Sequence, residues 1–363
     1  MDYYKTKSLR LSNADAARIK CIIKFLTGVE ILILKKKFLF SVLAAVFTLI
    51  IPFSVTGCKS GNVVKINEVT HSVFYAPLYL ADALGYFEDE GFKIELTNGG
   101  GADATMAAVL AGEADIGFCG PEATVYVHAG DSDDAPMVFG QLTKRDGSFL
   151  VGRTEQKDFK WSDLQGKDVL AGRAGGVPLM TFQYVLRNAG VTANCITNVA
   201  FNSMTAAFEG NVGDYCTMFE PTASEYQAAG KGYIVASVGE ASGEIPYTCF
   251  TAKQSYIDKN GDKVRGLLKA VTKAVKYVDG HDSATIAKLL VKYFDGTSEA
   301  SLKTSVDSYK KIDAWVKNMA MEETAYERLL DVIEQAGELK TRVPFHKAVL
   351  TEAADRAYRE IYG

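Results

Sequence analysis

Apolar residues along the chain alternate between short strand-like runs and stretches with helical spacing. Pro77–Leu84 is predicted to form a helix that stops at Gly85. A second helix, capped by Asp103, ends at Gly112 and directs three apolar side chains inward, those of Met106, Val109 and Leu110. The strands predicted around these helices are Val64–Val69, Phe92–Leu96, Ile116–Cys119 and Met137–Leu142. Strands separated by helices of about 10–15 residues indicate βαβ units and a parallel sheet.

The same pattern restarts beyond residue 159. A glycine turn, Gly172–Gly176, opens a helix that has Pro178 in its first turn and Gly190 at its end. The strands predicted here are Asp168–Ala171, Val199–Asn202, Tyr215–Phe219 and Tyr233–Val238. Two successive α/β units predict two lobes with a cleft between them.

The last hundred residues are predicted to be helical and to wrap the first lobe. One helix ends at Gly280, and its apolar positions are Val264, Leu267, Leu268, Val271, Val275 and Val278. Inward candidates on the later helices are Trp315, Leu329, Leu330 and Ile333.

Length and charge narrow the function classes. The chain has 363 residues, 48% of them hydrophobic, which is ordinary globular composition and allows about two domains. Residues 58–363 hold 31 basic and 41 acidic residues. Since affinity for nucleic acids comes mostly from Lys and Arg that neutralise phosphates, an acidic body argues against a nucleic-acid partner.

The front of the chain has the pattern of an export signal. Lys35-Lys36-Lys37 precedes Phe38–Val55, a run of 18 residues without charge, and small residues then lead to Cys58. This arrangement resembles a bacterial lipoprotein signal, in which Cys58 becomes the lipidated N-terminus. The alternative is a retained transmembrane anchor, but Pro52 and the small residues favour cleavage. Both place the body outside the cytoplasm, and the lipid anchor predicts attachment to the cell membrane.

Residues 1–34 fit neither a signal nor a domain, so we interpret them as an extension from a start codon assigned too early. The signal peptide is then 35–57 and the tether 58–63. Buried free thiols are expected at Cys119, Cys216 and Cys249, because each adjoins an apolar run. No Cys or His spacing predicts a metal site, and each of the four His is interpreted as a surface or packing residue.

Several motifs occur together in one order along the chain. They are the run from His71 to Ala81 (HSVFYAPLYLA), Gly85–Phe92 (GYFEDEGF), Leu110–Gly117 (LAGEADIG) and Lys160–Lys167 (KWSDLQGK). Together they resemble the ABC-transporter solute-binding proteins for nitrate, sulfonates, taurine and thiamine-precursor pyrimidines, the NMT1/THI5-like family. The resemblance covers roughly residues 64–345.

This resemblance implies an α/β fold of the type II periplasmic-binding class, with a ligand cleft and extra C-terminal helices. Lobe 1 would comprise 64–145 and 250–363 and lobe 2 146–249, with hinge crossovers near Thr143–Val151 and Gly243–Ala252. It also implies a monomer that takes one small molecule to a membrane permease and its ATPase, without catalysis, metal or cofactor.

Ligands of open α/β sheets bind beyond the carboxyl ends of strands, where glycines admit a ligand to helix N-termini. Four such loops supply the first candidates, which are Tyr75, Asn98, Gly99, Gly100, Gly120, Glu122, Arg173, Gly175 and Gly176. The remaining candidates are Phe201, Asn202, Glu220 and Tyr247. Each candidate also has an alternative role without a ligand. Each glycine run can be a plain tight turn, and Glu122 and Glu220 can neutralise the dipoles of their own helices. The aromatic residues can simply pack in the core.

The candidates point to different ligands. Glycine-rich helix starts with Arg173 suit an anion such as a sulfonate, whereas two carboxylates with aromatic rings suit a thiamine-precursor pyrimidine, which we favour. A pyrimidine-synthesising enzyme that acts with pyridoxal phosphate has the same fold, but the cysteine-rich run of that enzyme is missing here. A lipoprotein that senses ligand for a signalling partner stays open.

Overall fold

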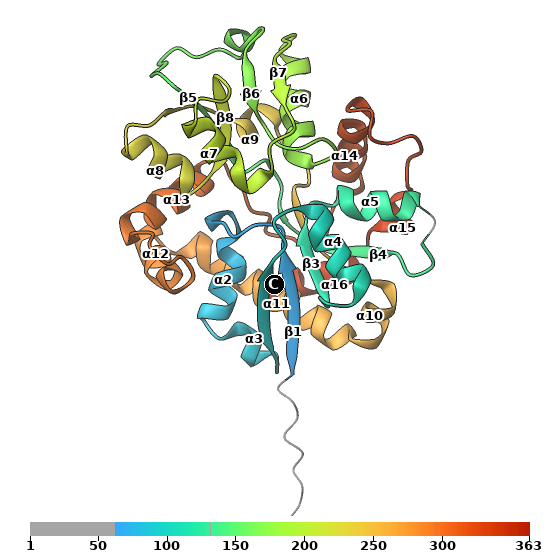
Figure 1. Ribbon diagram of the computed structural model, residues 1–363. Coiled ribbons are helices and arrows are strands. Elements are labelled where there is room, and N and C mark those ends of the chain that lie inside the picture. The colour runs from blue at the N-terminus through green and yellow to red at the C-terminus, as the bar shows by residue number, and fades with distance from the viewer. Residues whose placement is uncertain (1–61, 131) are drawn as a thin grey trace, which may run out of the picture. The chain divides into compact units, whose positions relative to one another are not determined.

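The computed structural model describes residues 62–130 and 132–363. The predictions for residues 1–34, for the signal at 35–57 and for lipidation of Cys58 lie outside these residues. Within them the chain builds two mixed five-stranded sheets. Figure 1 shows the strands of the two sheets in separate halves of this part of the chain, each with its own helices.

The first sheet has the strand order β2-β1-β3-β10-β4. Its strands are β1 (Val63–Glu68), β2 (Lys93–Asn98), β3 (Ile116–Cys119), β4 (Pro136–Thr143) and β10 (Thr248–Lys253). β1 is parallel to β2 and β3, whereas β10 is antiparallel to β3 and β4. Its early helices are η1 (Val73–Tyr75), α2 (Ala76–Ala83), α3 (Tyr86–Asp89), α4 (Ala102–Ala111) and α5 (Glu122–Ala129). We call these elements the first lobe.

The second sheet repeats this arrangement in the order β7-β6-β8-β5-β9. Its strands are β5 (Ser148–Gly152), β6 (Asp168–Leu170), β7 (Asn194–Ile196), β8 (Tyr215–Phe219) and β9 (Tyr233–Ser237). Its helices are η2 (Trp161–Leu164), α6 (Val177–Asn188), η3 (Phe201–Ser203), α7 (Met204–Glu209), α8 (Thr222–Ala228) and α9 (Val238–Ser242). We call these elements the second lobe. Here β5 is the antiparallel strand, pairing with β8 and β9.

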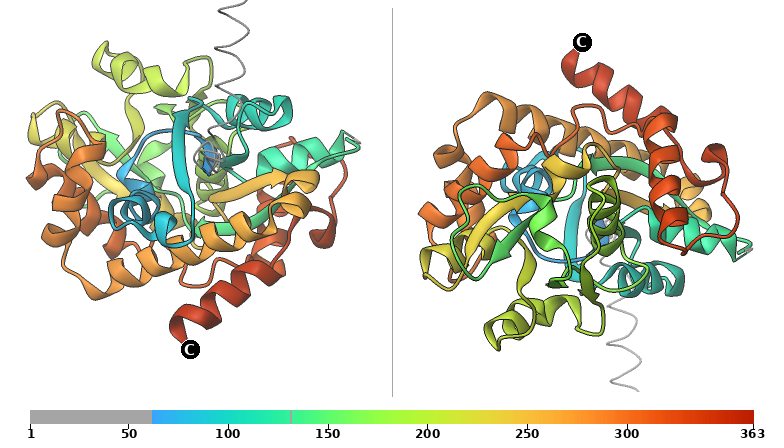
Figure 2. Two further views of the ribbon diagram at one scale, coloured as in Figure 1. Left: turned by 90° about the horizontal axis from the view of Figure 1, so that it is seen from below. Right: turned by 90° about the horizontal axis from the view of Figure 1, so that it is seen from above.

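The chain ends in a series of helices. They are α10 (Gln254–Lys259), α11 (Gly261–Gly280), α12 (Ser283–Leu290), η4 (Val291–Tyr293), α13 (Glu299–Lys311), α14 (Glu323–Gln335), α15 (Phe345–Ala348) and α16 (Glu352–Tyr362). Figure 2 shows α11 running beside the first sheet with α16 next to it, and the two helices are in contact. The prediction that these helices wrap the first lobe is correct only in part, because α13 contacts α8 and α14 contacts α6 in the second lobe.

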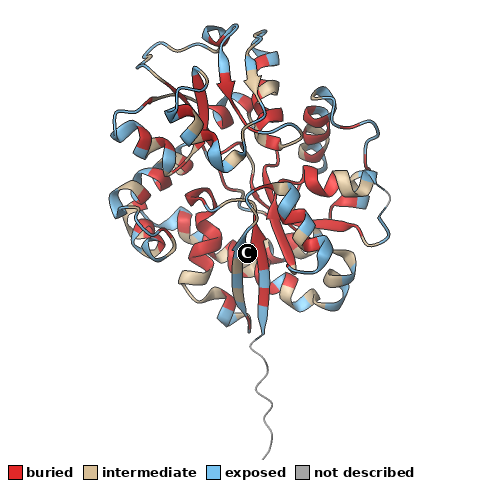
Figure 3. Cartoon of the chain, viewed as in Figure 1, coloured by how far each residue is buried: buried red, intermediate tan, exposed pale blue. Residues whose placement is uncertain are grey.

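Burial follows the apolar pattern that predicts the elements. Every residue of β3 and β4 in the first sheet and of β5 in the second is buried (Figure 3). On α11 the apolar positions predicted to face inward are all buried, since they fall on one side of a helix with 3.6 residues per turn. A smaller core around Val169 and Phe182 lies under the second sheet. The expected buried thiols are also present, since Cys119, Cys216 and Cys249 are buried and free.

The first crossover lies within the predicted range Thr143–Val151, since β4 ends at Thr143 and β5 begins at Ser148. Three local predictions are wrong. Val199–Asn202 is not a strand, because the edge strand is β7 and Phe201 begins the 3₁₀ turn η3. Asp103 does not cap α4, whose N-cap is Gly101, and Leu110 is 38% exposed because its side of α4 faces the interlobe cavity.

Candidate functional site

A cavity of about 640 Å³ lies between the two lobes. Its walls come from the N-terminal ends of α4, α5 and α6, from η3 and from the crossover that leads into β10. The carboxyl ends of β2, β3, β6 and β7 lead to α4, α5, α6 and η3, which is where open α/β sheets bind ligands. The volume is in the range of small-molecule sites, so the cavity is the candidate site.

Most of the lining is apolar. The aliphatic and methionine side chains in it are Val69, Met106, Leu110, Val127, Val177 and Pro178, with several alanines. Three aromatic rings form one wall, in which the Phe219 ring centroid lies 5.9 Å from that of Phe201 and 6.3 Å from that of Tyr247. Such rings offer flat faces on which a planar ligand can stack.

Arg173 is the one cationic side chain among the described residues that line the cavity. Its guanidinium pairs with the carboxylate of Asp103 in the first turn of α4, so the pair joins the two lobes. Burial pushes the pKa of Asp103 upward, but the hydrogen bond and charge of Arg173 outweigh it and hold that pKa below its usual value. An anionic ligand would have to compete with Asp103 for this cation.

Glu122 brings a second carboxylate to the cavity and is 2% exposed. It is the first residue of α5, and its Oε1 accepts a hydrogen bond from the backbone N–H of Val177, the first residue of α6, at 3.4 Å. Its Oε2 is buried and has no hydrogen-bond partner among the described residues. Burial raises the pKa of Glu122 to about 7, because nearby backbone N–H groups offset only part of the desolvation.

The loop between β6 and α6 contacts the first lobe at another point. The Tyr126 hydroxyl of α5 donates to the carbonyl of Gly175 at 2.9 Å. Gly175 has a φ of +77°, a conformation that suits glycine and lets the loop turn towards α5. The loop from Arg173 to Val177 is thus held against the first lobe by contacts with Tyr126, Glu122 and Asp103.

The structure brings together eight of the thirteen predicted ligand-binding residues. Those that line the cavity are Tyr75, Gly120, Glu122, Arg173, Gly175, Gly176, Phe201 and Tyr247. Those that do not line it are Asn98, Gly99, Gly100, Asn202 and Glu220. Contact of any of the thirteen with a ligand stays a prediction.

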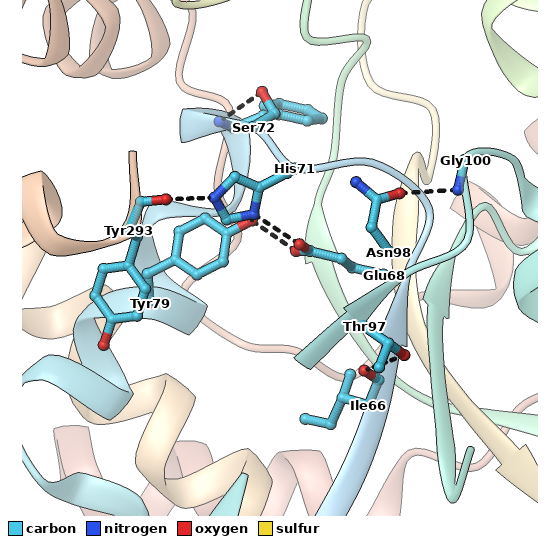
Figure 4. Close-up of polar contacts among 10 residues, drawn as sticks. Ile66, Glu68, His71, Ser72, Tyr79, Thr97, Asn98, Gly100 and Tyr293 are labelled. Atoms are coloured by element: carbon cyan, nitrogen blue, oxygen red, sulfur yellow. Dashed lines mark hydrogen bonds and ion pairs between the residues drawn. The ribbon is translucent and has the colours of Figure 1, made fainter. Parts of the chain in front are cut away.

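Asn98, Gly99 and Gly100 form a turn that is held by its own contacts. The Asn98 Oδ1 accepts a hydrogen bond from the Gly100 N–H at 2.8 Å, as Figure 4 shows. A Cβ at Gly99 would crowd the side chains of Asn67 and Thr105. The glycines therefore serve the turn here, and the next residue, Gly101, begins the cavity wall.

Glu220 is committed to its own surroundings. Its Oε2 accepts from the Ser224 N–H at 2.9 Å, and its Oε1 accepts from the Ser308 hydroxyl at 2.9 Å. The Ser224 bond lies in the first turn of α8, so the carboxylate satisfies a helix N-terminus, which was the alternative role considered for this residue. Asn202 is exposed on η3.

Sequence reasoning missed several lining residues, most importantly Asp103, Tyr126 and Phe219. Phe219 directly precedes Glu220 at the end of a predicted strand, so its position was a usable signal. Asp103 was interpreted as a helix cap, and nothing in the sequence pairs it with Arg173. Tyr126 lies within a helix, and only the packing of the lobes shows what its hydroxyl contacts.

A polar cluster next to the cavity joins β1 to the C-terminal helices (Figure 4). The buried Glu68 contacts His71 Nδ1 at 2.7 Å and accepts from the Tyr79 hydroxyl at 2.6 Å. His71 Nε2 lies 2.7 Å from the carbonyl oxygen of Tyr293 in η4. The hydrogen bond that His71 donates to Glu68 raises the pKa of His71 despite its partial burial. The cluster fixes the start of the segment that carries Tyr75.

A membrane-spanning helix and a metal site are both absent from residues 62–130 and 132–363. In these ranges no helix is long and apolar enough to cross a membrane. Nor do the described His, Cys, Asp and Glu side chains form a group that could hold a metal ion.

Residues 73–284 match the profile of the family described as "NMT1/THI5 like". The chain belongs to this family. Among its curated relatives is "Putative binding protein YtlA" of Bacillus subtilis (strain 168), which is 37% identical over 324 residues, 87% of this chain and 97% of that protein.

The curated relatives of the chain also include an enzyme. The 4-amino-5-hydroxymethyl-2-methylpyrimidine phosphate synthase of Aspergillus parasiticus is 26% identical over 226 residues, 56% of this chain and 63% of the enzyme. Among solved structures, the periplasmic nitrate-binding protein NrtA from Synechocystis PCC 6803 has a TM-score of 0.69 and 16% identity, covering 83% of this chain and 89% of NrtA. That likeness establishes the type II periplasmic-binding fold.

Proposed function

We propose that this protein is the solute-binding component of an ABC importer and captures a small planar heterocycle of the thiamine-precursor pyrimidine type. The two lobes would be 64–145 with 250–363 and 146–249, closing on one ligand and delivering it to a transmembrane permease with its ATPase. The similarity to a binding protein over 87% of the chain supports the binding role. A monomer suffices, because both lobes of the cavity come from one chain.

The lining of the cavity is the observation that carries the ligand class. It combines apolar side chains and an aromatic wall with two carboxylates, and Asp103 already neutralises its cation, Arg173. A planar, amine-bearing ring can stack on Phe219 or Tyr247 and donate to Glu122. The alternative cargo is an anion such as a sulfonate, taurine or nitrate, and it would meet the carboxylate of Glu122.

Thermal denaturation of the purified protein against a ligand panel tests this proposal. The panel holds 4-amino-5-hydroxymethyl-2-methylpyrimidine, its aminomethyl analogue, taurine, methanesulfonate and nitrate. A ligand at 100 times its Kd adds about 2.7 kcal/mol to stability, which is a clear rise in Tm. We expect the pyrimidines alone to raise Tm. A rise with the anions and none with the pyrimidines would refute the ligand class.

We also propose that Cys58 carries a lipid that holds the protein on the outer face of the cell membrane. The support is the basic stub, the apolar run and the small residues before Cys58. Expression in a bacterium followed by fractionation tests it. The wild type should sediment with membranes, whereas the Cys58→Ala variant should lose the lipid and keep an unprocessed signal. A lipid that survives this substitution would overturn the assignment.

Two other functions have support of their own. The similarity to a pyrimidine phosphate synthase favours an enzyme, and an assay for synthesis of the pyrimidine phosphate separates the two, because a binding protein should give no product. A ligand-sensing lipoprotein would use the same cavity. Reconstitution with the permease and ATPase separates transport from sensing, since only a transport component stimulates ATP hydrolysis when its ligand is present.

A further inference from the structure

Glu122 lies where two helices from different lobes begin. It is the first residue of α5, which has 8 residues, and its Oε1 accepts from the N–H of Val177, the first residue of α6, which has 12. Its carboxyl group folds back over Gly120, so closely that a Cβ at Gly120 would collide with both carboxyl oxygens. The glycine therefore makes room for this conformation of the Glu122 side chain.

The place that the carboxylate occupies is suited to an anion. The first N–H groups of a helix lack partners within the helix, and the helix dipole adds partial positive charge there, so N-termini bind oxyanions. At this cavity two such ends, those of α5 and α6, come together around one carboxyl group. The chain thus places its own carboxyl group where an anionic ligand would otherwise meet the N-termini of α5 and α6.

The hydrogen bonding of the second carboxyl oxygen, Oε2, gives independent support. Glu122 is 2% exposed, and its Oε2 has no hydrogen-bond partner among the described residues. A buried polar atom without a partner costs stability, so a donor that reaches it gains the full bond. The other polar side chains in the lining are the hydroxyls of Tyr75, Tyr126 and Tyr247, those of three threonines, and the Asp103–Arg173 pair. A ligand N–H group is the natural partner for Oε2.

We propose that Glu122 determines the ligand class: its carboxylate fills the oxyanion position between α5 and α6 and leaves Oε2 to accept an N–H donor from the ligand. This inference rests on the proposed function, because it names the group that selects a nitrogen heterocycle over an oxyanion. It makes Glu122 a specificity determinant whose removal should change what the cavity binds.

Calorimetric titration of the full protein with nitrate and with methanesulfonate at pH 8 tests the inference. Four proteins are compared, namely the wild type and the variants Glu122→Ala, Glu122→Ser and Glu122→Gln. Alanine and serine vacate the position, whereas glutamine keeps it filled with an uncharged group of the same size and is the matched control. Circular dichroism and the melting curve establish which variants are folded.

We expect no detectable binding of either anion to the wild type or to E122Q. E122A or E122S should bind at least one of them about 100-fold more tightly than the weakest binding that the titration detects, because charge-assisted bonds form to helix N-terminal N–H groups. Nitrate or methanesulfonate binding to the wild type below about 10 μM would overturn the inference, even if neither smaller variant folds. A folded E122A or E122S variant that binds neither anion more tightly than the wild type would overturn the inference as well.

Together with the thermal-denaturation panel, which measures pyrimidine binding, this experiment keeps the inference apart from the proposed function. If the wild type binds no pyrimidine but E122A gains anion binding, Glu122 is the selector and the proposed cargo is wrong. If the wild type binds pyrimidines and the folded smaller variants gain no anion, the cargo is right and the selector lies elsewhere.

Discussion

Replacing Glu122 with glutamine should remove one component of the pH dependence of stability. Burial raises the pKa of this carboxyl from 4.5 to about 7, so between these values the folded protein keeps a proton that the unfolded chain has lost. Stability therefore falls as the pH rises through this window, and the loss is complete above about pH 7. At about 1.4 kcal/mol per pKa unit, the loss is about 3 kcal/mol.

Glutamine has the same size and no charge, so the E122Q variant lacks this loss. Its amide introduces donors near the Oε2 position, which shifts its stability by a constant amount at all pH values. The quantity to compare is hence the change between pH 4.5 and pH 8. Over this range E122Q should gain about 3 kcal/mol relative to the wild type. Asp146 and Glu220, whose pKa values burial also raises, titrate in both proteins and cancel.

Urea denaturation at pH 4.5, 5.5, 6.5, 7.5 and 8 measures the effect. Tryptophan fluorescence reports on both lobes, because Trp161 lies in η2 of the second lobe and the Trp315 indole N–H donates to the carbonyl of Phe74 in the first. The exposed Glu113 provides the control, and the E113Q variant should follow the wild-type pH curve. Parallel pH curves for the wild type and E122Q would refute the claim that burial raises the pKa of Glu122 in the folded protein.

Three further predictions concern stability. The substitution Gly120→Ala should lower the free energy of unfolding by about 1–3 kcal/mol in the wild type. The loss should be smaller in a Glu122→Ala background, because no carboxyl group meets the new Cβ there. A double-mutant cycle by urea denaturation measures the difference. His71→Ala should lower the melting temperature more at pH 6 than at pH 9. The raised pKa of His71 stabilises the fold below pH 6.5, and this stabilisation is lost as the pH rises through the pKa of the folded state. Equal losses of melting temperature at the two pH values would contradict the contact with Glu68. Leu267→Ala, fully buried on α11, should cost about 2–5 kcal/mol by denaturant unfolding, and a loss below 1 kcal/mol would contradict its burial.

The fold could be predicted where the apolar pattern had one dominant period. β8 has the predicted bounds, Tyr215–Phe219, because it is a short buried run between helices. β7 was missed because an edge strand of 3 residues, Asn194–Ile196, has too few apolar positions to show a period. The neighbouring Val199 and Phe201 supplied a false signal, since both pack against the core from a loop and a 3₁₀ turn.

The candidate site was predictable as a set of loops but not as a set of contacts. Strand ends and glycines located Gly120, Glu122 and the Arg173 loop, because parallel strands bring their carboxyl ends to one edge. Glu122 and Glu220 share the same local pattern of strand, carboxylate and helix, and the sequence could not separate them. What separates them is tertiary, since Ser224 and Ser308 satisfy Glu220 while Glu122 Oε2 has no partner among the described residues.

The contacts between the lobes at the cavity converge on one short loop. Arg173 pairs with Asp103, the Gly175 carbonyl accepts from Tyr126, and the Val177 N–H donates to Glu122. Two of these contacts use the backbone of the loop, so they depend on its conformation and not on its side chains. A ligand that binds Glu122 therefore acts on the same loop that joins the lobes, and recognition and interlobe contact are coupled there. Arg173 is then better understood as the partner of Asp103 across the cavity than as a reader of anions, because an anion that recruited it would release Asp103 and one of the contacts that hold the lobes together.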